Sequence, residues 1–184
     1  ANGDAGMAML VTHISAATGA FTWMVMERIR FGKASALGIV TGMVAGLGTI
    51  TPASGYVGPG GALIIGLSAG VVCFFATIYI KQRLKIDDSL DVFPVHGVGG
   101  ILGMLLTGVF ASNALGVFSG QEDIAITSQV GTQALGVVAT VLYTGVVTWG
   151  ILKFTDAMVG NRVDEDQEQE GLDLVSHNER GYAL

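Results

Sequence analysis

The sequence predicts an all-α membrane protein, a polytopic bundle of five transmembrane helices. Of its 184 residues, 51% are hydrophobic, only 13% are charged and 28 are glycines. A soluble domain carries about 25% charged residues and about 7% glycine. Half the usual charge with twice the usual glycine is typical of helices that pack closely in lipid.

The spans follow from the places where charged residues are missing, because a charge at the bilayer centre costs about 2.5–3.5 kcal/mol. Four blocks contain no Asp, Glu, Lys or Arg: 5–26, 34–80, 92–121 and 124–152. A span needs about 20 residues, so the second block holds two helices, divided by a turn rich in Pro and Gly at 51–61. The predicted transmembrane region 1–160 therefore has helices at about 5–26, 34–50, 60–80, 91–111 and 125–152.

The basic residues predict the orientation. With five spans, every Lys and Arg falls on one side of the membrane: Arg28, Arg30, Lys33, Lys81, Arg83, Lys85, Lys153, Arg162 and Arg180. The other side has Asp4, Glu122 and Asp123 and no basic residue. The positive-inside rule then places the amino end outside and the acidic segment 161–184 in the cytoplasm, with the chain as a multi-pass protein of the plasma (inner) membrane.

Glycines recur at every fourth residue in three of the predicted helices. The sets are Gly38, Gly42 and Gly46, then Gly66 and Gly70, then Gly99 and Gly103. Small residues at this spacing let two helix backbones approach closely in lipid. Packing is the favoured role for most of them, and a compact bundle is expected.

His96 is the strongest candidate for a functional side chain. Apart from His13, it is the only ionisable residue well inside a predicted span. Such residues usually face a cavity or a partner. Val92, four residues earlier, and Gly99 and Gly100, three and four later, share its helix face. A nearly bare face beside an imidazole predicts a lumen or a tightly apposed helix.

Other features predict structure rather than chemistry. Asp88 or Ser89 is expected to cap the helix that carries His96, with Asp91 in its first turn. His13 lies among small and apolar residues, so we expect its nitrogens to be satisfied across a helix interface. His177 has no second ligand at a matching spacing. No phosphate loop or nucleophile elbow is present, so no enzyme activity, metal, cofactor or nucleic-acid partner is expected.

Four segments carry a resemblance to a known family. The segment 91–100, Asp-Val-Phe-Pro-Val-His-Gly-Val-Gly-Gly, resembles the tenth helix of the ammonium transporter/methylammonium permease/Rhesus family. Segments 51–57 and 60–66 resemble the turn before the ninth helix of that family and the start of that helix, and 160–177 resembles its cytoplasmic tail. The resemblance runs the whole chain in order. It implies the carboxy-terminal half, helices seven to eleven, of an eleven-helix ammonium-transporter fold built from inverted repeats.

The resemblance also implies roles for individual residues. His96 corresponds to the second of two pore histidines, and Val92 to an apolar pore residue one turn below it. Thr51 corresponds to a residue near the outer vestibule, and Asp91 to an acid beside the inner mouth. The first pore histidine, the gate phenylalanines and the recruitment site belong to helices outside this sequence. Phe93-Pro94 departs from the commoner Phe-Gly of the family.

The function implied is transport of ammonium, or conduction of ammonia, by a homotrimer with one pore per subunit. Neutral ammonia can pass a narrow apolar lumen that a hydrated cation cannot cheaply enter. The tail 161–184 is expected to be regulatory and to meet a PII-type signalling protein. Its candidate residues are Arg162, Gly171, Leu172 and Asp173.

Two other functions remain open. One is an ammonium sensor of the same family, although a sensor usually adds a folded signalling domain and the tail is too short for one. The other is a purely structural membrane subunit, which would not explain why a histidine lies inside a span at position 96.

Overall fold

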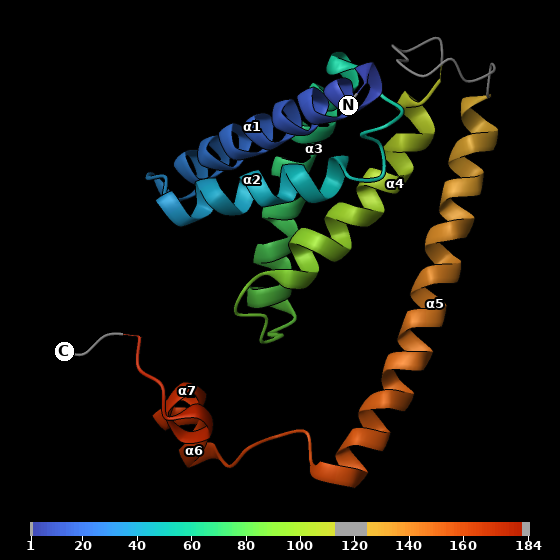
Figure 1. The fold of residues 1–184 in the computed structure, drawn as a ribbon. Helices are drawn as coiled ribbons and strands as arrows, with labels where there is room; N and C mark the ends of the chain where they lie inside the picture. Colours follow the sequence, from blue (N-terminus) through green and yellow to red (C-terminus); the bar gives the residue numbers. More distant parts are fainter. Residues whose placement is uncertain (1, 113–124, 182–184) are drawn as a thin grey trace. The chain divides into compact units, whose positions relative to one another are not determined.

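The computed structural model of the protein describes residues 2–112 and 125–181, and every regular element in these ranges is helical. The elements in chain order (Figure 1) are α1 Gly3–Phe31, α2 Ala36–Ile50, α3 Pro59–Ile78, the π-helix η1 Tyr79–Arg83, the π-helix η2 Phe93–Val98, α4 Gly99–Phe110, α5 Ile126–Val159, α6 Glu165–Glu170 and α7 Leu172–His177. The all-α prediction is confirmed. The predicted acids Glu122 and Asp123 lie outside the described residues.

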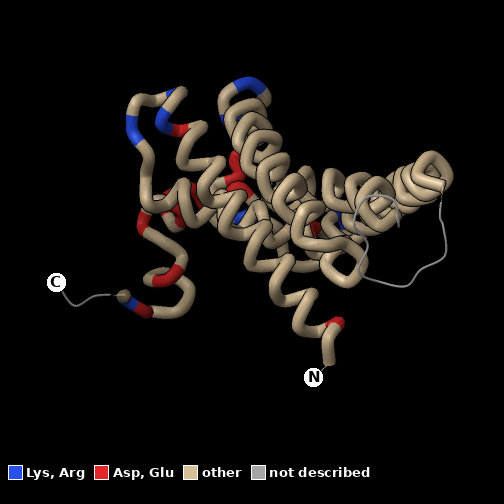
Figure 2. Tube along the Cα trace, turned by 90° about the horizontal axis from the view of Figure 1, so that it is seen from above, with Lys and Arg blue, Asp and Glu red and all other residues tan. Residues whose placement is uncertain are grey.

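The chain divides into two compact units, Ala1–Val138 and Ala139–Leu184, and the division falls within α5. Among the described residues, four helical stretches are long and apolar enough to cross a membrane: Gly3–Phe31, Pro59–Arg83, Phe93–Phe110 and Ile126–Val159. These helices are uncharged over most of their length (Figure 2). The helix α2 is shorter, because its 15 residues extend only about 22 Å at 1.5 Å per residue.

Two helices continue past the ends that the sequence predicts. α1 was expected to end near residue 26 but runs to Phe31, where Gly32 at φ 78° donates its N–H to the carbonyl of Arg28. α5 was expected to end near 152 and runs to Val159. Charged residues limit the part of a helix that lies in lipid, but they do not end the helix. Arg28 and Arg30 also suit the negative end of the α1 dipole.

Glycines let α1 approach α2 and α3 closely. Ser15 Oγ of α1 donates a hydrogen bond of 2.9 Å to the Gly46 carbonyl of α2. A Cβ on Gly46 would lie 2.8 Å from the Ser15 carbonyl carbon, and one on Gly42 would lie 2.7 Å from the Gly19 oxygen. A Cβ on Gly70 of α3 would also collide with α1. The close helix contacts predicted from the glycine spacing are confirmed.

The core of the first unit consists of two buried clusters. One is formed by Val11, Ile50, Ala53, Val57, Ala62 and Ile65. The other is formed by Trp23, Ala45, Cys73, Phe74 and Val95. Val95 is 3% exposed and belongs to η2, so the second cluster anchors this π-helix against α1, α2 and α3.

Candidate functional site

The segment that carries His96 is a π-helical turn fixed by an aspartate. Asp88 accepts hydrogen bonds of 2.8 Å from the backbone N–H groups of Val92 and Phe93, one on each carboxylate oxygen. Both bonds lower the pKa of Asp88, and the bond from Phe93 has the larger effect. Of the two predicted caps, Asp88 is therefore the one used, while Ser89 Oγ donates to Asp87. π-Helical turns are rare and are found frequently at functional sites.

The burial of its neighbours decides which way His96 points. Pro94 and Val95 are buried, and His96 is exposed. Val92, on the same side, is 52% exposed. Gly48 of α2 lies beside the imidazole. A Cβ at this glycine would be 3.9 Å from His96 Nδ1. The imidazole therefore stands on an open face of the described residues, beside a helix that carries no side chain at that point.

The glycines that follow His96 differ in their surroundings. A Cβ on Gly99 would lie 2.9 Å from Thr49 Oγ1 and 3.3 Å from Cys73 Sγ, so Gly99 is at a tight helix contact. Gly100 has nothing within 4 Å of such a Cβ. The sequence predicted a lumen or an apposed helix, and the two glycines show one apposed helix and one open side.

Thr51 lies on the same side of α2 as Gly48, at the carboxy-terminal end of the helix. It is the C-cap of α2, it is exposed, and its Oγ1 donates to the Leu47 carbonyl at 2.7 Å. Gly48 and Thr51 are three residues apart and share one face of the helix. Because Gly48 lies beside His96, the structure places Thr51 one helical turn along α2 from the imidazole.

Asp91 does not lie in the first turn of a helix, as the sequence predicted. It has a left-handed backbone at φ 56° and precedes η2. Its Oδ1 lies 2.6 Å from Lys81 Nζ of η1. Asp88 caps the helix as expected, but the prediction for Asp91 is wrong because the helix begins only after it, and its backbone is left-handed. The Asp91 carboxylate pairs instead with the Lys81 cation of η1.

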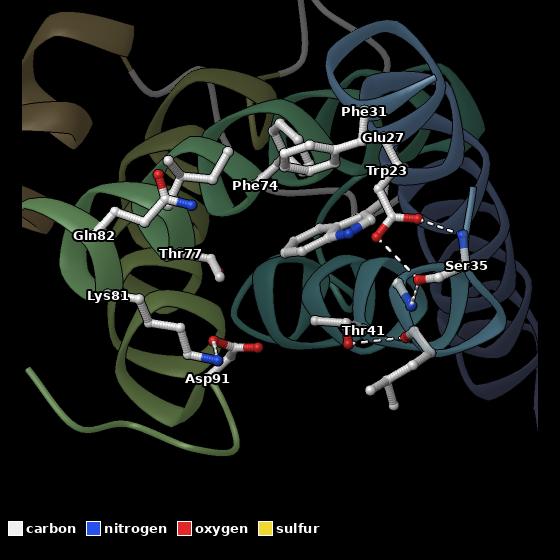
Figure 3. A pocket seen from close by; sticks show the side chains of 13 residues that line it. Trp23, Glu27, Phe31, Ser35, Thr41, Phe74, Thr77, Lys81, Gln82 and Asp91 are labelled. Carbon is white, nitrogen blue, oxygen red and sulfur yellow. Dashed lines mark hydrogen bonds and ion pairs between the residues drawn. The ribbon is translucent and has the colours of Figure 1, made fainter. Parts of the chain in front are cut away.

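Asp91 and Lys81 line a pocket of about 230 Å³ (Figure 3). Trp23 and Phe74 form an aromatic part of its wall, with ring centroids 5.5 Å apart in an edge-to-face arrangement. Among the described residues that line this pocket, His96, Val92 and Thr51 do not occur. The four predicted pore residues therefore lie in two places: His96, Val92 and Thr51 are on an open face, and Asp91 lines a pocket beside Lys81.

Glu27 is a pocket residue that the sequence reasoning missed. Its carboxylate accepts 2.7 Å and 3.0 Å hydrogen bonds from the N–H and Oγ of Ser35, and Ser35 Oγ accepts the N–H of Gly38 (Figure 3). Glu27 thereby ties the end of α1 to the start of α2. The signal was present, because Glu27 and Lys81 each follow directly after a charge-free block.

His13 is satisfied differently from the prediction. It is exposed, and its Nδ1 lies 2.9 Å from the Met9 carbonyl of its own helix, one turn back. The prediction of a partner across a helix interface is wrong, because the carbonyl at i−4 is within reach of the imidazole.

The four candidate tail residues lie in the second unit. Arg162 makes two hydrogen bonds of 3.0 Å to the Glu168 carboxylate of α6. Gly171, at φ 103°, separates α6 from α7, and Leu172 and Asp173 are the first residues of α7. Both residues of this first turn are exposed.

Comparison with known proteins identifies the family. Residues 1–182 match the family described as Ammonium Transporter Family. A putative ammonium transporter of Methanothermobacter thermautotrophicus is 43% identical over 182 residues, which are 98% of this chain and 45% of that protein. Ammonium transporter Amt1 of Archaeoglobus fulgidus is 41% identical over 186 residues, covering 99% of this chain and 46% of that protein. The chain spans less than half the length of these relatives.

Solved structures of the same kind share the fold. The crystal structure of Saccharomyces cerevisiae Mep2 matches with a TM-score of 0.77 and 36% identity, over 86% of this chain and 38% of that one. A structure described as a sensor Amt protein matches with a TM-score of 0.85 and 28% identity, over 96% of this chain and 43% of that one. This chain, a membrane protein with several apolar helices, belongs to the ammonium transporter family, a family of transporters and not of enzymes.

Proposed function

We propose that the whole protein moves ammonium or ammonia across the plasma membrane, as a nitrogen-uptake system, through a narrow pore to which this chain contributes one wall. The observation that carries the proposal is the setting of His96. A capped π-helical turn holds it, buried neighbours turn it outward, and it lies beside a glycine of α2. An imidazole fixed on an open face inside an apolar span is suited to line a path.

The chemistry of these side chains fits passage of a neutral species. A neutral imidazole offers one donor and one acceptor, so it can hydrogen-bond ammonia and exchange a proton with it. The exposed Val92 beside it gives an apolar surface that disfavours a hydrated cation. The proton that ammonium gives up would pass to the imidazole of His96, and ammonia that has moved past it would take a proton back from water at the inner mouth.

The proposal includes five spans and one orientation. Besides the four long apolar helices, the shorter α2 would also cross the membrane, lengthened by the turn at 51–56 that follows it. This brings the number of spans to five. The amino end would lie outside, and 161–184 would be a cytoplasmic regulatory tail below a membrane region 1–160, because all nine basic residues then share the inner side. The chain would supply helices seven to eleven of an eleven-helix subunit in a homotrimer, with a PII-type protein as the tail's partner.

The test is uptake of methylammonium by the full-length protein with His96→Ala. We expect uptake to fall to background or to change strongly in selectivity, while the oligomer still assembles in detergent. His13→Ala is the matched control, since His13 is also an exposed histidine within a predicted span but lies in α1. Near-normal uptake by His96→Ala, or a larger loss with His13→Ala, would remove His96 from the pore.

A second candidate function is ammonium sensing, which the likeness to the sensor Amt structure favours. A transporter reconstituted in liposomes moves methylammonium at a rate that His96→Ala abolishes. A sensor binds ammonium and changes conformation with no net flux. Flux in liposomes therefore decides between the two.

A further inference from the structure

The turn that carries His96 is held at both ends by contacts within this chain. Asp88 binds the start of the turn, and Thr49 of α2 lies against Gly99, three residues after His96. Both contacts are formed among the described residues, so neither depends on what lies over the open face of the imidazole.

Asp88 satisfies the first free N–H groups of this helical segment. A helix begins with backbone N–H groups that have no partner within it. Those of Val92 and Phe93 donate at 2.8 Å to the two oxygens of the Asp88 carboxylate. Pro94 has no N–H, and the N–H of Val95 donates at 3.0 Å to a backbone carbonyl. Asp88 is therefore the side chain that holds the start of the turn.

Thr49 fixes the other end through the helix that follows the turn. It is fully buried, and Gly99 and Gly103, one helical turn apart on α4, lie against it. A Cβ on Gly99 would lie 2.9 Å from Thr49 Oγ1, and one on Gly103 would collide with the Thr49 carbonyl. Thr49 therefore fits between the two glycines only in a narrow range of rotations of α4 about its axis. His96 precedes Gly99 by three residues, so this fit also limits the direction of the imidazole.

We propose that Asp88 and Thr49 are positioning residues of His96, in that the cap sets where the turn starts and the glycine contact sets the rotation of α4. A side chain that hydrogen-bonds a passing molecule must keep its place, since a misplacement of about 1 Å can cost about a hundredfold in rate. Asp88 precedes the apolar stretch Phe93–Phe110, so the direction of a side chain inside this stretch is set in part from outside it. The effect on transport rests on the proposed function, whereas the effect on the imidazole does not.

The first test observes the imidazole without any transport. The full-length protein is prepared with isotope-labelled histidine in liposomes, and solid-state nuclear magnetic resonance records the ring signals, those of His96 being assigned by their absence in His96→Ala. We expect Asp88→Ala to shift or broaden the His96 signals, and Asp88→Asn, which keeps one acceptor oxygen, to do so less. The signals of His13, which is bonded within α1, should stay unchanged. Asp87→Asn is the control variant, because among the described residues Asp87 accepts a hydrogen bond only from Ser89.

The glycine contact is tested in the same way. Thr49→Leu overfills the space between Gly99 and Gly103 and should also displace the His96 signals, whereas Thr49→Val keeps the volume of the side chain and should leave them in place. Initial rates of methylammonium uptake are measured on the same variants. We expect a loss of about tenfold in Asp88→Ala and Thr49→Leu, and rates close to normal in Asp87→Asn and Thr49→Val.

The outcomes separate this proposal from the proposed function. Unchanged His96 signals in Asp88→Ala, with the oligomer intact by gel filtration, would overturn the role of Asp88 and would show that burial of Val95 is enough to direct the imidazole. Unchanged signals in Thr49→Leu would overturn the role of Thr49 in the same way. Equal changes at His13 and His96 would show a general loss of structure and would also contradict the proposal. Displaced His96 signals with normal uptake would keep the positioning roles and would instead remove His96 from the pore.

Discussion

Lys81 Nζ lies 2.6 Å from Asp91 Oδ1, and this ion pair joins the π-helical end of α3 to the residue that leads into η2. The Asp91 backbone is left-handed, which costs an ordinary residue roughly 1–2 kcal/mol. Partners on both sides hold it there, because Asp88 caps the helix that follows while Lys81 binds the Asp91 carboxylate. The segment that positions His96 is thus tied to α3 as well as to its own cap.

The first prediction concerns the strength of this pair. Lys81→Met and Asp91→Asn should each lower the melting temperature of the protein in detergent, and the double variant should lose less than their sum. The side chains are 37% and 18% exposed, so we expect a coupling of about 1 kcal/mol that declines in high salt. Lys85→Met is the control, since Lys85 has no acidic partner in the described ranges. Additive losses in the cycle would show that the pair contributes nothing.

The second prediction concerns the cap. The pKa of Asp88 is lowered in the folded protein, so its contribution to stability is present above its ordinary value and is lost as pH falls through the lowered one. Asp88→Asn keeps only one acceptor oxygen and should lower the melting temperature at neutral pH. The melting temperature of this variant should also fall less between neutral and acid pH than that of the unchanged protein.

Asp87→Asn is the matched control for the cap, because Asp87 is exposed and accepts a hydrogen bond only from Ser89 in the described residues. Melting is followed from about pH 7 to about pH 3. The same acid dependence in Asp88→Asn and in the unchanged protein would contradict the prediction.

The third prediction concerns the contact between α1 and α2. Gly46→Ala places a methyl group against the Ser15 backbone and should destabilise the protein by about 1–3 kcal/mol. Gly131→Ala is the control, since a Cβ there meets nothing within 4 Å and alanine favours a helix. Thermal unfolding of both variants measures the difference. Equal melting temperatures would mean that α1 and α2 are not in close contact in the membrane.

The fourth prediction concerns orientation. In a Cys73→Ala background, a cysteine at Gly55 should react with an impermeant maleimide from outside the cell, and one at Arg83 only after the membrane is opened. Both positions are exposed, one in the turn after α2 and the other at the end of η1. Labelling of position 83 from outside would reverse the topology.

The fifth prediction concerns the tail. Gly171 has φ 103°, where a side chain is strained, so Gly171→Leu should disturb the junction of α6 and α7. In the full-length protein, this change or deletion of 161–184 should alter transport while membrane insertion stays normal. Gly181→Leu, in open space after α7, should have no effect. Normal transport and an intact response to nitrogen status after the deletion would make the tail passive.

Much of the fold could be predicted from the sequence because lipid restricts composition so strongly. Charge-free blocks locate helices, and glycines four apart locate close contacts such as that of Gly46 with Ser15. The bare positions around His96 predicted a lumen or a tightly apposed helix beside it, and the described residues leave its side chain exposed next to Gly48. The ion pair of Lys81 with Asp91 did not follow, because the backbone of the loop between the two predicted spans decides which of its charged side chains meet, and no periodicity encodes that backbone.

The π-helical turns could not be predicted either. Apolar periodicity does not separate a π-turn from an α-turn over six residues, and Pro94 argues only for an early helical position. The predicted place of Asp91 in the first helical turn was wrong because the sequence does not show that the backbone is still left-handed at this residue, although it did identify Asp88 as a candidate cap.

The π-turn at 93–98 has a consequence for how this segment can change. α4 has a fixed phase, because Gly99 and Gly103 must meet Thr49, and the cap has a fixed position at Asp88. A π-turn holds one residue more than an α-turn, so it absorbs an angular offset between two such constraints. Deleting one residue of 93–95 would give His96, relative to the cap at Asp88, the angular position that Val95 now has, about 100° away, so the cap and the contacts of α4 could not both be kept. The extra residue of the π-turn therefore lets the cap and the contacts of α4 hold at the same time while the imidazole stays on the open face.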